Sequence, residues 1–284
     1  MTYALLILTA SLSVSTADLT LHDAARNRDI PVKIYYSSST QPAPLIVFSH
    51  GYGGNMDGYS YLGEAWATAG FIVICPTHKG SDRDAILHSG SEPLRDPAES
   101  FALQADRTSD VKFILSSLGT VESSIPELRG KIDKGRIGVG GHSMGAGTAM
   151  LLAGATAMSP EGRRTSFRDS RVKAIVAMSP QGSSEEGFDQ HSWDDIHIPV
   201  MVMSGTRDRG VGGQSPEWRQ EAYNRMPPGE KYEVIVDGAG HLAFAIGKRF
   251  HDCIAAESTA FWKKELLGSA AAIQSTRQCQ VNSK

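Results

Sequence analysis

One short stretch of the sequence carries the residues best suited to covalent chemistry, Gly141-His-Ser-Met-Gly145. Ile137 and Val139 precede it as the end of a buried strand. Residues 148–153 after it are small and apolar, as in a helix packed on a sheet. A serine on so sharp a strand-to-helix turn is held in a strained backbone conformation that raises its hydroxyl clear of the sheet. The two glycines avoid a collision between a Cβ and the neighbouring strand or helix. The stretch therefore predicts that Ser143 is a nucleophile for carbonyl carbon.

A serine hydroxyl is a weak nucleophile until a base takes its proton, so the chain must also supply a base and an acid that orients it. His241 is the candidate base, because it lies in a glycine-rich loop directly after the predicted strand 232–236. Asp208 is the candidate acid, because it lies on the loop that follows the predicted strand 199–203. It would fix the tautomer of His241 and stabilise the imidazolium. The weaker candidates for the acid are Asp189, Asp194, Asp195 and Asp237.

Acyl transfer by serine also needs backbone amides that bind the oxyanion of the tetrahedral intermediate. The amide of Met144 opens the helix after the serine, where negative charge is favoured. The glycine-rich loop 49–54 directly follows the apolar run 45–48, and the amide of Tyr52 is the candidate second donor. The Tyr52 ring can also form one wall of the acyl site. A simple turn without this role is the alternative, and we expect His50 to pack beneath the loop.

Further substrate contacts are expected in the connections between strands. The long polar stretch 76–96 leaves the end of a strand where α/β folds place their sites, so we expect it to line the pocket, with His78 as a substrate contact. Only about sixteen residues separate the stretch 179–182 from the strand 199–203. This leaves little room for a helical lid and predicts an open site that admits a bulky or polymeric ester. Trp193, in this gap, either packs in the core or borders the cleft.

Composition sets bounds on the fold and on the partners. A chain of 284 residues, with 40% hydrophobic and 21% charged residues, is typical of a globular α/β enzyme of one domain, here residues 18–267. A net charge of −3 gives no electrostatic reason to expect nucleic acid or an anionic membrane as a partner. The chemistry of the triad requires no cofactor or metal, and the sequence has no cluster of Cys and His that would ligate one.

The two ends of the chain suggest export. Residues 1–17 carry no charge and run from the apolar stretch 3–10 into small residues, as in a secretory signal peptide. The apolar stretch is too short for a transmembrane helix. We therefore expect a secreted or periplasmic protein, with an ordinary N-terminal strand as the alternative. In an exported protein, Cys253 and Cys279 can form a disulfide that ties the tail 268–284 to the last helix, worth about 3 kcal/mol. Two unpaired thiols are the alternative.

Taken together, the motifs resemble the α/β-hydrolase superfamily over residues 18–267. The motifs that carry the resemblance are Phe48-Ser-His-Gly-Tyr52, Arg107-x-x-Asp110, Gly141-His-Ser-Met-Gly145, Ser204-Gly-Thr-Arg-Asp208 and Gly240-His241. Within the superfamily, the sequence looks most like the predicted dienelactone hydrolases, which are related to platelet-activating-factor acetylhydrolases and to polyester-cleaving cutinases. The resemblance implies an α/β-hydrolase fold, with a mostly parallel eight-stranded sheet flanked by helices and little or no lid.

The resemblance also implies a function, carboxylic-ester hydrolysis through an acyl-enzyme. Cutinases and PET hydrolases carry a tryptophan shortly after the sixth strand, in an Ala-Pro-Trp context. This chain has Gln181 in the matching stretch, so we expect Gln181 to contact the substrate. The leading hypothesis is a serine carboxylesterase for small or bulky esters. A polyester hydrolase is the alternative within the same chemistry, and a catalytically inactive binding module is the alternative from another class.

Overall fold

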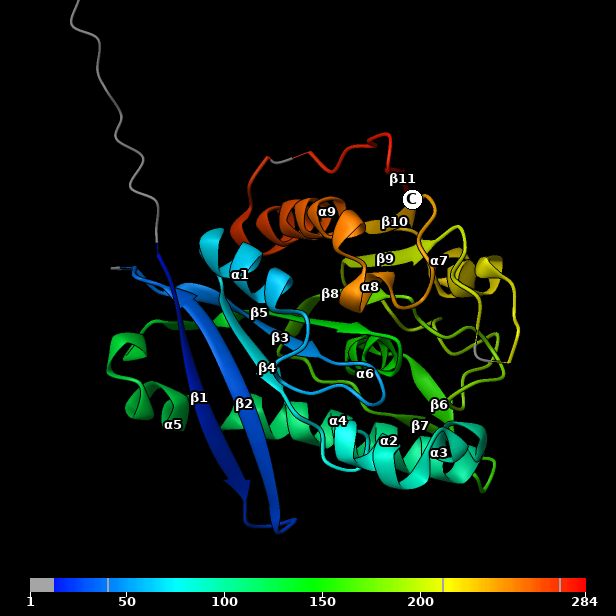
Figure 1. The fold of residues 1–284 in the computed structure, drawn as a ribbon, viewed down its shortest axis with the longest axis horizontal. Helices are drawn as coiled ribbons and strands as arrows, with labels where there is room; N and C mark the ends of the chain where they lie inside the picture. Colours follow the sequence, from blue (N-terminus) through cyan, green and yellow to red (C-terminus); the bar gives the residue numbers. More distant parts are fainter. Residues whose placement is uncertain (1–12, 40, 211, 271) are drawn as a thin grey trace, which may run out of the picture.

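A computed structural model describes residues 13–39, 41–210, 212–270 and 272–284 of the chain. In this part of the chain the largest sheet has nine strands, and six neighbouring strands in its middle run parallel (Figure 1). In spatial order they are β1 (Val14–Asp23), β2 (Arg28–Ser37), β4 (Ile72–Pro76), β3 (Ala43–Ser49), β5 (Ile132–His142), β8 (Val172–Met178), β9 (Val200–Gly205), β10 (Lys231–Val236) and β11 (Cys279–Ser283). The strands β1, β2 and β11 pair antiparallel with their neighbours at the two edges.

Helices cover both faces of the sheet, so the central strands are buried on both sides (Figure 1). Along β3, Leu45 and Val47 pack in one core cluster, whereas Ile46 and Phe48 pack in the other. This alternation explains why β3 is a continuous apolar run. One face is covered by α4 (Pro97–Ser116), α5 (Leu118–Ser124), α6 (Met144–Ala153) and α7 (Glu221–Arg225). The other face is covered by α1 (Ser60–Thr68), α8 (Ala243–Ile246) and α9 (Lys248–Leu267).

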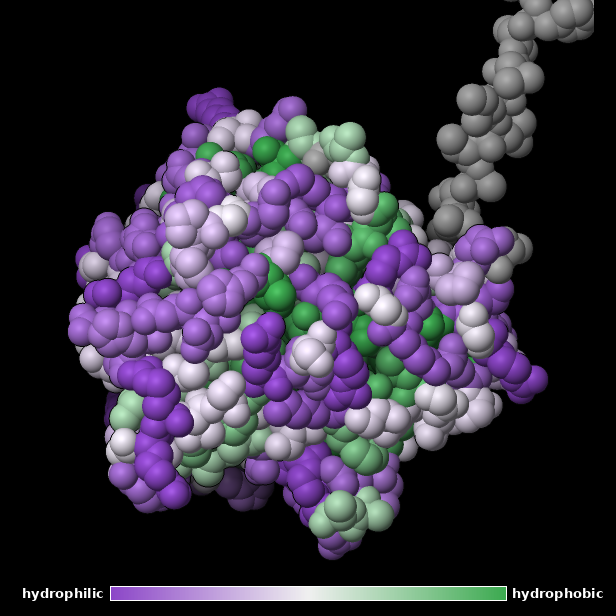
Figure 2. All heavy atoms as spheres, turned by 180° about the vertical axis from the view of Figure 1, so that it is seen from behind, coloured by the Kyte–Doolittle hydropathy of each residue, from purple (hydrophilic) through white to green (hydrophobic). Residues whose placement is uncertain are grey.

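The remaining elements are short and lie in the connections. The stretch 76–96, expected to be a loop, contains α2 (Arg83–Ser89) and α3 (Glu92–Arg95). The 3-10 helices are η1 (Pro126–Leu128) and η2 (Pro216–Gln220), and β6 (Thr156–Met158) pairs with β7 (Arg164–Ser166) in a separate small sheet. Seen from behind, the surface is mostly hydrophilic, and its apolar areas are small and separated by polar side chains (Figure 2).

The C-terminal tail corrects the predicted number of strands from eight to nine. Residues 279–283 form β11, which pairs with β10 over five residues. The tail is polar and has no strand pattern in its sequence, so its pairing is set by tertiary contacts. Cys253 of α9 and Cys279 form the predicted disulfide, with their Cα atoms 6.3 Å apart. The disulfide anchors the edge strand to the last helix.

The predicted signal peptide lies mostly outside the described residues, because the structure describes the chain from residue 13 onward. Residues 14–17, which the sequence assigned to the signal, form the beginning of β1 and pair with residues 34–37 of β2. Among the residues that the structure describes, no helix combines the length and the apolar content that a bilayer crossing needs.

Candidate active site

The turn between β5 and α6 has the geometry that its sequence predicts. Ser143 has φ 54° and ψ −122°, a conformation that is strained for a residue with a side chain. The turn is tight enough that only glycine fits on either side. A Cβ on Gly141 would lie 2.1 Å from the carbonyl oxygen of Gly145, and a Cβ on Gly145 would lie 2.0 Å from that of Ser49. The sharp turn therefore depends on both glycines, and it places the serine hydroxyl above the end of the sheet.

The structure brings together the three side chains that the sequence proposed as nucleophile, base and acid. His241 Nε2 lies 3.0 Å from Ser143 Oγ, and His241 Nδ1 lies 3.1 Å from Asp208 Oδ1. Asp208 is fully buried, whereas the side chain of His241 is 23% exposed. With Nδ1 donating to the carboxylate, Nε2 is left free to accept the proton of the serine hydroxyl. The arrangement can generate a serine alkoxide and return its proton to a leaving group.

Two backbone amides next to Ser143 are available to a ligand. Met144 is the first residue of α6, so its amide has no acceptor within the helix. The amide of Tyr52 has no hydrogen-bond acceptor among the described residues. Its loop lies against the serine, because a Cβ on Gly51 would be 3.4 Å from Ser143 Cβ. The sequence proposed these two amides as oxyanion donors, and their surroundings are compatible with that role.

The motif Arg107-x-x-Asp110 holds the loop 49–54 in place through buried hydrogen bonds. The buried guanidinium of Arg107 donates to the His50 carbonyl oxygen and, over 3.1 Å, to Ser49 Oγ. As predicted, the His50 ring packs beneath the loop, where it is 1% exposed. Asp110 accepts a hydrogen bond from Arg28 and faces His78, rather than pairing with the arginine of its own motif. The motif therefore fixes the loop that carries the Tyr52 amide.

The site's residues lie within one family match. Residues 31–270 match the PET hydrolase-like family. The chain belongs to this family. The similar curated proteins include a cutinase of Thermobifida alba, named cutinase est2, which is 28% identical over 74% of this chain and 56% of its own length. Cutinase 2 of Thermobifida cellulosilytica is 24% identical over 74% of this chain and 64% of its own length. The platelet-activating factor acetylhydrolase of Cavia porcellus is 24% identical over 76% of this chain and 55% of its own length.

The chain thus spans little more than half the length of most of the curated relatives that it matches. The PET hydrolase-like match confirms the resemblance to α/β-hydrolases, and it includes Ser143, Asp208 and His241.

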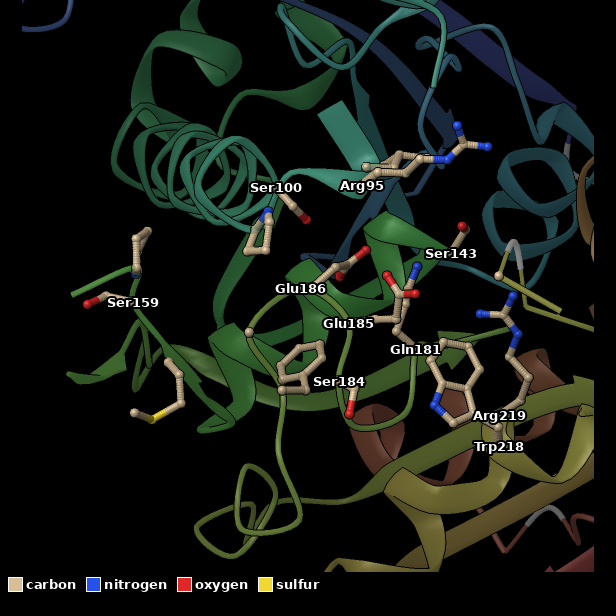
Figure 3. A pocket seen from close by; sticks show the side chains of 17 residues that line it. Arg95, Ser100, Ser143, Ser159, Gln181, Ser184, Glu185, Glu186, Trp218 and Arg219 are labelled. Carbon is tan, nitrogen blue, oxygen red and sulfur yellow. The ribbon is translucent and has the colours of Figure 1, made fainter. Parts of the chain in front are cut away.

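A cavity of about 640 Å³ opens beside the nucleophile of this PET hydrolase-like chain. Figure 3 shows Ser143, Gln181 and Arg219 around one side of it and Ser159 on the opposite side. Its lining residues are Leu94, Arg95, Pro97, Ser100, Ser143, Met158, Ser159, Pro160, Gln181, Ser184, Glu185, Glu186, Gly187, Phe188, Gly212, Trp218 and Arg219. Gln181 lies at the cavity, as the sequence predicted, and the end of the stretch 76–96 reaches it through Leu94 and Arg95.

The structure corrects the predicted substrate contact of His78 and decides between the two alternatives for Trp193. His78 is fully buried, with Nδ1 3.0 Å from Asp110 Oδ2 and Nε2 3.0 Å from Ser49 Oγ, so it supports the loop rather than facing the cavity. Trp193 is also fully buried and packs against Phe188, with ring centroids 5.7 Å apart. The sequence left Trp193 between the core and the cleft, and the structure places it in the core. The Tyr52 ring is not among the residues that line this cavity.

Two further residues surround the carboxylate of Asp208, and the sequence analysis assigned neither a role. Ser179 donates a hydrogen bond to Asp208 Oδ2, and its Oγ lies 2.7 Å from His241 Nδ1. Arg219 places its Nε 3.2 Å from Asp208 Oδ1. Burial by itself would raise the pKa of Asp208. The hydrogen bond from His241 and the charge of Arg219 outweigh burial and keep this pKa below its ordinary value.

A second histidine, His142, contacts the loop that carries His241. The His142 ring is tilted against the His241 ring, with the centroids 4.8 Å apart, and its Nε2 lies 3.0 Å from the His241 carbonyl oxygen. The hydroxyl of Tyr59 lies 2.7 Å from His142 Nδ1. Burial, with a smaller contribution from His241, lowers the pKa of His142 well below its ordinary value. A neutral His142 can therefore accept from Tyr59 and donate to the His241 backbone.

Proposed function

We propose that this chain is a serine carboxylic-ester hydrolase that works through a covalent acyl-enzyme. One observation carries the proposal: His241 Nε2 lies 3.0 Å from Ser143 Oγ, while its other ring nitrogen faces the buried carboxylate of Asp208. The family match and the names of the cutinase relatives support the same chemistry. An inactive binding module would have no need for a strained serine held in register with a base and an acid.

The reaction follows from these positions. His241 Nε2 takes the proton of Ser143 as Oγ forms a bond to the carbonyl carbon of the ester, and Asp208 stabilises the resulting imidazolium. The amides of Tyr52 and Met144 would bind the oxyanion of the tetrahedral intermediate. As the bond to the alcohol oxygen breaks, His241 gives its proton to that oxygen. Water then repeats the sequence on the acyl-enzyme, releasing the acid and restoring the serine.

The cavity supports a finer proposal about the substrate. Three of its lining residues, Ser100, Gln181 and Glu186, each have a buried side-chain oxygen without a hydrogen-bond partner among the described residues. Unpaired buried polar atoms are costly, and a polar ligand group that reaches them offsets that cost. We therefore propose that the acyl or alcohol part of the ester carries hydroxyl or carbonyl groups. A long saturated or purely aromatic ester would leave these atoms unpaired.

A polyester hydrolase is the second candidate. The family is described as PET hydrolase-like, and several similar proteins are named cutinases. Ser143 lies on the wall of a cavity that opens to the surface, which suits a chain end or a loop of polymer. The cavity wall carries Gln181 and two carboxyl side chains, Glu185 and Glu186, which favours polar over aromatic polyesters. The disulfide supports the further proposal that the protein is exported.

The experiment uses the purified full chain and a matched Ser143→Ala variant. We expect hydrolysis of p-nitrophenyl acetate and butyrate and covalent labelling by a fluorophosphonate, and we expect Ser143→Ala to lose both. A folded wild-type protein that neither turns over these esters nor becomes labelled would refute the proposal. Binding of the esters without turnover would identify the binding module instead.

The substrate proposal has its own comparison, between p-nitrophenyl butyrate and p-nitrophenyl 3-hydroxybutyrate. One satisfied hydrogen bond in the cavity is expected to favour the hydroxylated ester by about tenfold in kcat/KM. Ser100→Ala, at one of the unpaired oxygens, should reduce that preference. Equal rates for the two esters would contradict this part of the proposal and leave ester hydrolysis intact. Release of soluble product from polyester film, at a rate that Ser143→Ala abolishes, would establish the second candidate.

A further inference from the structure

The buried side chain of Arg219 contacts the candidate acid, the candidate base and the two loops beside them. Arg219, on η2, is 1% exposed. Its Nη1 donates to the carbonyl oxygens of Ser179, at 3.2 Å, and of Pro180, at 3.0 Å. Its Nη2 donates to the carbonyl oxygen of Arg209 at 3.3 Å. One guanidinium therefore ties together the loops that follow β8 and β9.

The same guanidinium places a positive charge between the acid and the base. Arg219 Nε lies 3.2 Å from Asp208 Oδ1, and Nη2 lies 3.3 Å from His241 Nδ1. Asp208 Oδ1 is also the oxygen that faces His241 Nδ1, at 3.1 Å. The carboxylate that would stabilise a protonated His241 is thus shared with a permanent cation, and both Asp208 and Arg219 are buried, where charges are weakly screened.

We propose that Arg219 is a positioning residue of the ester hydrolysis proposed above: it clamps the loops of Ser179 and Asp208, so that both side chains hold the imidazole of His241 toward Ser143. The clamp acts on geometry, because Ser179 and Asp208 orient the imidazole. The guanidinium itself is needed for this clamp, because a lysine would preserve the charge but not the planar set of donors.

The charged and titratable groups around His241 come from several elements. They are Asp208 after β9, Arg219 on η2, His142 at the end of β5, and the hydroxyls of Ser143 and Ser179. Burial lowers the pKa of His142 well below its ordinary value, so this neighbour is neutral in the working range. Glu185 and Glu186 act on Arg219 from the other side. Asp208 and Arg219 are therefore the permanent charges in contact with the imidazole.

The test compares Arg219→Gln, Arg219→Lys and a matched control, Arg225→Gln. Arg225 lies on α7, pairs with Glu221 and is partly exposed, so its substitution removes one positive charge from the same region without touching the site. The readout is kcat and KM for p-nitrophenyl butyrate, measured separately for each variant. Circular dichroism and thermal unfolding report whether each variant is folded.

Arg219→Gln removes the charge and most of the donors, so we expect it to lose at least about tenfold in kcat at unchanged KM. Arg219→Lys should also lose about tenfold in kcat at unchanged KM, because it keeps the charge but not the planar set of donors that holds the two loops. Arg225→Gln should leave both quantities unchanged.

A purely structural role predicts a different pattern, with lower thermal stability but a wild-type kcat in the folded protein of both variants. That result would overturn the proposal, and so would a wild-type kcat in Arg219→Lys alone, because the charge without the set of donors would then be enough. If Arg219→Gln does not fold, Arg219→Met provides the same loss of charge with a better packed side chain. A wild-type enzyme inactive on all esters would instead refute the proposed function, so the two failures are distinguishable.

Discussion

Glu186 offers a test of the buried electrostatics that is independent of catalysis. Its side chain lies against α6, and its Oε2 accepts a 2.6 Å hydrogen bond from Nε2 of Gln104 on α4. There is space for it because residue 147 is glycine; a Cβ on Gly147 would lie 2.2 Å from Glu186 Oε2. Burial raises the pKa of Glu186 from its ordinary 4.5 to about 8, although the Gln104 hydrogen bond and the charge of Arg107 oppose this rise.

The sign and size of the effect follow from linkage. The folded protein binds this proton more tightly than the unfolded chain, so the contribution of Glu186 to stability is complete below pH 4.5. It is lost progressively as the pH rises from 4.5 through about 8. The full difference between the two pKa values corresponds to about 5 kcal/mol. Glu186→Gln removes the titration, and its amide oxygen can still accept from Gln104. The substitution should therefore be nearly neutral at pH 4.5 and stabilising by up to about 5 kcal/mol above pH 8.

The assay is urea unfolding of the wild type and of Glu186→Gln at pH 5 and pH 8.5, with the free energy of unfolding extrapolated to water. Glu185→Gln, at the neighbouring and more exposed carboxyl, is the matched control, and its effect should be small at both pH values. A difference between the wild type and Glu186→Gln that is the same at pH 5 and pH 8.5 would refute the reasoning, because it would show that the buried carboxyl does not titrate in this range.

Three further predictions concern the tail, the turn and the acid. Replacing Cys253 and Cys279 with serine opens a loop of 26 residues and should cost about 3.5 kcal/mol, seen in calorimetry as a fall in Tm of roughly 7–14 °C; an unchanged Tm would contradict this. Gly145→Ala should lower kcat/KM at least about a hundredfold, because its Cβ would lie 2.0 Å from the Ser49 carbonyl oxygen; a normal rate in steady-state kinetics would contradict the tight turn. Ser179→Ala should lower kcat by about tenfold at constant KM, since it removes a hydroxyl bound to the acid; a change in KM alone would point to substrate binding instead.

The three side chains that the sequence proposes as nucleophile, acid and base, and that the structure brings together, have local signals. Ser143, Asp208 and His241 each follow an apolar strand near glycines, so the short stretch around each residue is enough to propose it. The two amides are predicted by the same logic, since they belong to turns that leave central strands. The strand β11 has no such signal, because its pairing with β10 and its disulfide are tertiary contacts.

The parts that the sequence missed depend on contacts between distant segments. Arg219 reaches His241 from 22 residues away, and Tyr59 reaches His142 from 83 residues away. An arginine just before a helix is normally a solvated side chain, so no local pattern distinguishes this one. Ser179 lies two residues before Gln181, and only its contacts with Asp208 and His241 reveal its role.

The ionisation of the buried carboxyl groups shows the same dependence on distant partners. Asp110 and Glu186 are both buried, and burial alone raises the pKa of each. Hydrogen bonds from His78 and Arg28 lower the pKa of Asp110 to about 2, whereas Glu186, with an amide as its hydrogen-bond donor, stays near 8. Asp208 belongs with Asp110, because it faces His241, Ser179 and the Arg219 charge. Asp208 is therefore ionised because of neighbours that only the tertiary structure brings to it. Arg219 is one of these neighbours, so substituting Arg219 tests the site directly.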